Sequence, residues 1–204
     1  MALIGFAGIR NMALSLVLLE HMHDKAHANL LKEEFVRSLM AGALANELSG
    51  NAREGEEAFI GAMFQNLGRL LTEFYFPEEA RQIRGMLAAA AARGPVLPRD
   101  ETSASITVLG LSFEELGLGV ARAWGLPDSL QRCMRKPVGE APQRGADKTE
   151  RLKWLTFAAN EVTDALLRAE PGKTSAAIAE AAERFAQVLG VTPREVLAAA
   201  TVAQ

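Results

Sequence analysis

Polar residues recur at helical spacing within residues 59–74, a stretch that is otherwise apolar. Gln65 and Arg69 stand four residues apart, so their side chains come within reach of each other on a helix. Asn66 and Glu73 continue this polar set, while the apolar residues around it step by three and four. Amide and guanidinium groups bind polar or anionic partners, so the pattern predicts a central helix that carries one polar site within a helical core.

All three histidines of the chain fall within residues 21–27. His23 and His27 lie one helical turn apart, and Asp24 follows His23, which is a spacing that suits a metal site. No cluster of carboxylates or cysteines elsewhere in the sequence completes a ligand set. We therefore interpret these residues as a polar helix end and loop, and we predict neither a metal nor a cofactor.

Covalent and acid–base chemistry finds little support in the other residues. Cys133 is the sole cysteine, and no histidine lies near it in the sequence, so we do not interpret it as a nucleophile. The sequence has no Ser/His/Asp set and no phosphate-binding glycine loop. We interpret Glu101, Glu114 and Glu115 as helix starts and solvated turns, because acidic residues suit the first turn of a helix.

The apolar spacing and the helix start and stop signals predict a helical chain. Ser112 with Glu115, and Thr192 with Glu195, have the pattern of capping boxes. We interpret residues 94–98 and 138–148 as loops. We expect helices at residues 5–20, 31–48, 54–76, 77–92, 112–124, 126–136, 149–168 and 174–189, and a last one from residue 192.

The composition favours helices over sheet. The 204 residues are 49% hydrophobic and only 6% aromatic, with abundant alanine and leucine, which is enough for one sizeable core. We predict an all-α fold, a single-domain helical bundle of about 8–10 helices. We expect one helical domain over residues 1–170, with a C-terminal helical hairpin over residues 171–204 packed on it.

The charge balance and the cysteine count limit which binding partners and which cellular compartment we expect. The net charge of −3 gives no field that would attract nucleic acid or an anionic membrane. No apolar run reaches the ~18 residues of a membrane span. A single cysteine permits no internal disulfide and suits a reducing environment. We expect a cytoplasmic protein with no nucleic-acid and no membrane partner.

Two blocks of the sequence resemble a known family. Residues 63–69 read Met-Phe-Gln-Asn-Leu-Gly-Arg, where the HD superfamily of metal-dependent phosphohydrolases has two hydrophobic residues, His-Asp, a hydrophobic residue and Gly-Lys. Residues 101–127, with Leu109-Gly110, Trp124 and Leu126-Pro127, resemble the HDOD branch of bacterial signalling domains, in which the metal ligands are often lost. The resemblance implies an HD-type helical bundle. It also implies that helices of the family are missing before residue 5, so we expect the chain to be a piece of a longer protein.

The same resemblance locates the lost metal site. It places the family's first histidine, its His-Asp pair and its late His-His pair on Arg37, on Gln65 and Asn66, and on Arg135 and Lys136. A further family histidine falls near Phe113. Guanidinium and ammonium groups repel a divalent ion, and amides without carboxylates bind one weakly. Without a metal, nothing lowers the pKa of an attacking water, so the resemblance implies no phosphohydrolase activity and no enzyme.

Two functions of different classes remain open. The first is a non-catalytic regulatory module that docks a partner protein or a neighbouring signalling domain of a longer chain. The second is a sensor, in which a remnant pocket binds an anionic ligand such as a nucleotide second messenger. The residues of that pocket would be Arg37, Gln65, Asn66, Arg69, Arg135 and Lys136. A filled pocket favours the docking module, and a hollow pocket favours the sensor.

Overall fold

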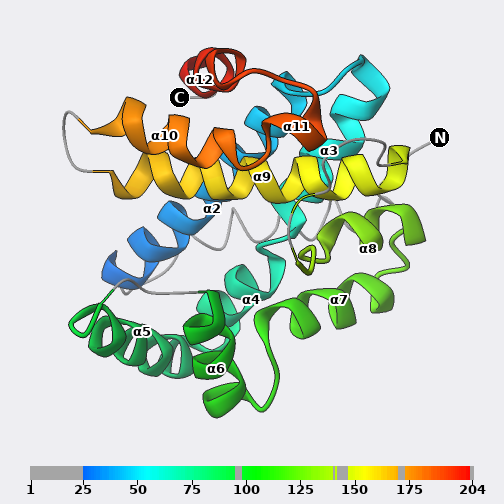
Figure 1. Cartoon of the computed structure of the whole chain (residues 1–204). Coiled ribbons are helices and arrows are strands. Elements are labelled where there is room, and N and C mark those ends of the chain that lie inside the picture. Colours follow the sequence, from blue (N-terminus) through cyan, green and yellow to red (C-terminus); the bar gives the residue numbers. More distant parts are fainter. Residues whose placement is uncertain (1–24, 95–97, 140, 142–146, 170–172, 203–204) are drawn as a thin grey trace. The chain divides into compact units, whose positions relative to one another are not determined.

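A computed structural model describes residues 25–94, 98–139, 141, 147–169 and 173–202. These residues form eleven helices and contain no strand, so the prediction of an all-α fold is confirmed. The helix expected at residues 5–20 and most of the histidine cluster lie outside the described residues. The helices, labelled in Figure 1, are α2 Lys25–Glu47, α3 Ala52–Phe64, α4 Leu67–Tyr75, α5 Pro77–Ala91, α6 Pro98–Leu109, α7 Phe113–Ala123, α8 Asp128–Met134, α9 Lys148–Arg168, α10 Thr174–Glu183, α11 Ala186–Leu189 and α12 Pro193–Val202.

The chain divides into two compact units. Of the described residues, unit 1 consists of those within Val36–Gln65 and Leu126–Gln204, and unit 2 consists of those within Asn66–Gly125 and those before Val36. Unit 1 therefore holds α3 and α8 to α12, unit 2 holds α4 to α7, and α2 contributes residues to both. The separation of a domain at residues 1–170 from a hairpin at residues 171–204 stays a prediction.

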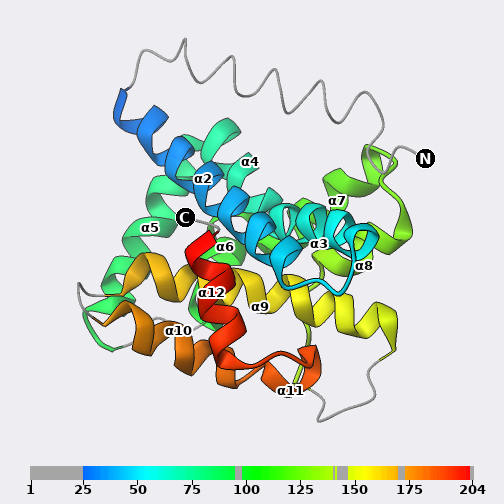
Figure 2. The same ribbon diagram turned by 90° about the horizontal axis from the view of Figure 1, so that it is seen from above.

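Unit 1 is built around α9. Helices α3, α8, α10 and α11 pack against α9, and α12 packs against α10. Figure 1 shows α10 alongside α9, and Figure 2 shows α12 beside the same pair. Trp154, Phe157 and Phe185 meet in the core with ring centroids 5.8–6.3 Å apart, so α9 and the C-terminal helices bury one shared apolar surface.

Unit 2 depends on a close crossing of two helices. Helix α4 packs on α5 and α7, and α5 packs on α6. A Cβ atom at Gly68 of α4 would overlap the carbonyl oxygen of Phe113 and lie 2.7 Å from its carbonyl carbon. A Cβ atom at Gly117 of α7 would lie 3.1 Å from the backbone nitrogen of Gly68. The two backbones approach this closely because glycine occupies both positions.

The single central helix predicted over residues 54–76 is wrong, because the chain turns at Gln65 and Asn66 and forms α3 and α4 instead. Asn66 has φ −97° and ψ 5°, a conformation of turns that suits short polar side chains. The predicted helix at 174–189 is likewise split into α10 and α11, at Phe185, whose ring packs on Trp154 and Phe157.

Helix α6 was not among the predicted helices. Its sequence is rich in serine, threonine and other residues of modest helix propensity, and its packing on α5 compensates for that. Both capping boxes are confirmed, the one at Ser112 and Glu115 and the one at Thr192 and Glu195. Within the described ranges, no single helix has both the length and the hydropathy to cross a membrane. Helices α6 and α7 have this length and hydropathy only when taken together, and the pair is bent by 66°.

Candidate functional site

Gln65 lies in the interior of unit 1 and is only 8% exposed. Its Nε2 donates to the backbone oxygen of Cys133 at 3.1 Å and to Oγ1 of Thr156 at 3.3 Å. Its Oε1 accepts a hydrogen bond from Nδ2 of Asn160 at 3.1 Å. Both ends of the Gln65 amide are therefore bound by protein groups from α8 and α9.

Asn160 joins this amide to α3. Its Nδ2 also donates to the backbone oxygen of Ala62 at 3.0 Å, and the residue is 7% exposed. Thr156 Oγ1 donates to the Cys133 oxygen at 3.0 Å. We name Gln65, Thr156, Asn160 and the Cys133 carbonyl the amide network. Thr156 and Asn160 were not predicted as site residues, although two polar residues one turn apart in an apolar helix are a usable signal.

Helix α3 packs closely against Cys133 and Thr156 at Gly61, one turn before Gln65. A Cβ atom at Gly61 would lie 2.8 Å from Cβ of Cys133 and 2.9 Å from Cγ2 of Thr156. Burial, and to a lesser extent the negative charge of Glu57, raise the pKa of the Cys133 thiol to about 11 against the opposing charge of Arg132. The thiol is therefore protonated at neutral pH and acts as part of the packed interior.

Arg37, where the family's first histidine was placed, also lies in unit 1. It is 9% exposed, and its Nε and Nη2 lie 2.6 Å and 2.5 Å from Oδ1 of Asp164 on α9. A carboxylate of the same unit therefore already neutralises this guanidinium. Arg135 and Lys136 follow α8 in the same unit and are exposed.

Asn66 and Arg69 belong to unit 2. Asn66 is 8% exposed and precedes α4 without capping it through its side chain. Arg69 forms ion pairs with Glu101 of α6 and, at 3.6 Å, with Glu34 of α2. One turn along α4, Glu73 pairs with Arg84 of α5. We name the five charged residues the charged network of unit 2: Glu34, Arg69, Glu73, Arg84 and Glu101.

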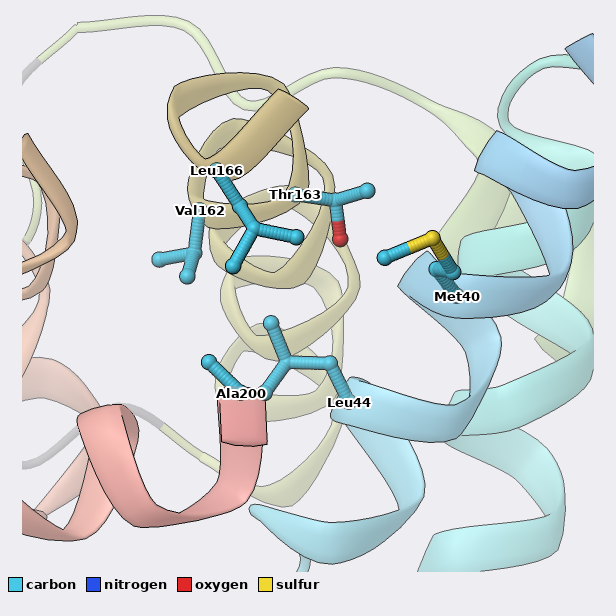
Figure 3. Close-up of a pocket in the computed structure, with 6 residues that line it drawn as sticks. All are labelled: Met40, Leu44, Val162, Thr163, Leu166 and Ala200. Atoms are coloured by element: carbon cyan, nitrogen blue, oxygen red, sulfur yellow. The ribbon is translucent and has the colours of Figure 1, made fainter. Parts of the chain in front are cut away.

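Neither of the two hollows described for unit 1 is lined by a residue of the predicted pocket. The first is a cavity of about 10 Å³ between α2, α9 and α12 (Figure 3), which is the space of about one water molecule. The second is an open hollow of about 450 Å³ between the end of α2 and the start of α3. A ligand-binding role for the six predicted residues stays a prediction.

The described residues contain no group of three or more histidine, cysteine, aspartate or glutamate side chains placed to hold a metal ion. Of the three histidines at residues 21–27, only His27 lies within the described residues, and it belongs to α2. At the position of the family's His-Asp pair, the donor set is two amides, which fits a metal poorly.

Comparison with known proteins adds one finding. The family model of the HDOD domain matches residues 1–137, which include both blocks quoted from the sequence. No curated protein and no solved structure matches the chain.

Proposed function

Because the chain belongs to the HDOD family of signalling-related, HD-like helical domains, we propose that it is a non-catalytic regulatory module. It acts through contacts with a partner protein or with a neighbouring domain of a longer chain. It hydrolyses no phosphate ester, and a small ligand is not its input.

The amide network carries this proposal. At the position where HD hydrolases have a metal-binding pair by resemblance, Gln65 is buried and hydrogen-bonded to Cys133, Thr156 and Asn160. At Gly61, one helical turn before Gln65, the side chains of Cys133 and Thr156 leave no space for a Cβ atom. A neutral network whose members satisfy one another stabilises a unique packing, and a bound ion or substrate would have to displace it.

The distribution of positive charge supports the docking module over the sensor of nucleotide second messengers. Arg37 and Arg69 face carboxylates at Asp164 and Glu101. An anionic ligand would have to compete with these carboxylates for each guanidinium. Arg135 and Lys136 are exposed, so water screens their attraction for an anion.

The test measures metal content and phosphodiester hydrolysis on the same purified samples. Bis(p-nitrophenyl) phosphate and cyclic dinucleotides are offered with added Mn²⁺, and the melting temperature is recorded with each nucleotide. We expect less than stoichiometric metal, no turnover above the blank and no shift of the melting temperature.

Two variants distinguish hydrolysis by this chain from hydrolysis by a contaminating enzyme. Gln65→Ala alters the amide network, and Gln82→Ala changes an exposed glutamine of α5 as a matched control. Stoichiometric metal together with turnover that Gln65→Ala abolishes and Gln82→Ala preserves would overturn the proposal. A saturable shift of the melting temperature by a cyclic dinucleotide would replace the docking module by the sensor.

A further inference from the structure

We draw no further inference here: the strongest candidate, the small cavity between α2, α9 and α12 of unit 1 together with the exposed apolar side chains of Val36 and Leu39 on α2, carries none because nothing in the structure shows what covers this face.

Discussion

The end of α3 in unit 1 and the polar face of α4 in unit 2 hold their polar groups by different means. In unit 1, the buried polar groups at the end of α3 are neutral amides, a hydroxyl and a carbonyl, joined by hydrogen bonds of 3.0–3.3 Å. In unit 2, the polar face of α4 carries Arg69 and Glu73, which are paired with charged residues of other helices. Gln65 and Arg69 stand only four residues apart in the sequence, yet they belong to different networks.

Exposure of the pairing cation accounts for part of the difference, since Glu73 itself is only 6% exposed. Gln65, Asn160 and Thr156 are all at most 8% exposed, and charges at such positions would lose most of their hydration. In the charged network, the side chain of Arg84 is 36% exposed, so part of its hydration is kept. A deeply buried neutral network gives directional specificity, whereas the charged network depends on ionic strength.

The largest expected effect is a steric change at the α4–α7 crossing of unit 2. Gly68→Ala should lower the free energy of unfolding by about 3 kcal/mol, because its Cβ meets the Phe113 backbone, which cannot move aside. Gly61→Ala in unit 1 meets side-chain atoms and should cost less, about 2 kcal/mol. Urea unfolding measures both, and Gly119→Ala, which meets nothing within 4 Å, should cost nothing. A smaller loss for Gly68→Ala than for Gly61→Ala would contradict this ordering.

The neutral network gives the next largest effect. Asn160→Leu should lower the free energy of unfolding by about 2 kcal/mol, because it leaves the acceptors on Ala62 and Gln65 without their donor. Adding Gln65→Leu should cost less than the sum of the two single changes, because both partners are then apolar. The loss should be the same at low and high salt. Additive costs would show that the two amides do not interact.

The charged network should respond less strongly and, unlike the neutral network, in a way that depends on salt. Arg84→Met leaves Glu73 unpaired, and we expect a loss of about 1 kcal/mol, discounted because Arg84 is partly exposed. The loss should shrink in about 1 M salt, where the Debye length falls to about 3 Å. Arg81→Met breaks an exposed pair with Glu78 and is the control with no expected effect. A loss that salt does not change would contradict the electrostatic account.

The smallest effects compare the two capping boxes, one in each unit. The backbone amide of Ser112 lowers the pKa of Glu115, and that of Thr192 lowers the pKa of Glu195, through hydrogen bonds to the carboxylates. A lowered pKa stabilises the folded chain at neutral pH, and this contribution is lost as the pH falls through the folded-state pKa. Glu115→Gln and Glu195→Gln should therefore lower the melting temperature slightly at neutral pH and not in acid. An effect that persists in acid would exclude the carboxylates as its cause.

Local signals predicted much of the fold. The capping boxes at Ser112 and Thr192 gave correct helix starts because they depend on residues only three apart. The turn at Gln65 and Asn66 was missed because the apolar spacing continues through it on both sides. What favours the turn is the set of hydrogen bonds that Gln65 makes with α8 and α9, which lie far away in the sequence.

The candidate site shows the same limit. The family resemblance pointed to Arg37 and Gln65, and both are buried polar residues of unit 1. The sequence could not show that Asp164 pairs with Arg37 or that Asn160 binds Gln65, because these partners lie more than 90 residues away. Long-range pairing of this kind depends on helix packing, which residue spacing within one helix does not report.

The buried thiol makes the interior of unit 1 accessible to kinetic measurement. Cys133 is the single cysteine of the chain, its side chain is buried, and its raised pKa keeps it protonated. A thiol reagent therefore modifies the native chain only through openings that expose α8. With opening and closing faster than the chemistry, the labelling rate reports the equilibrium constant for that opening. Slower labelling of Cys133 in the presence of a docking partner would therefore show that the partner stabilises α8 against opening. The natural sequence needs no introduced cysteine for this measurement.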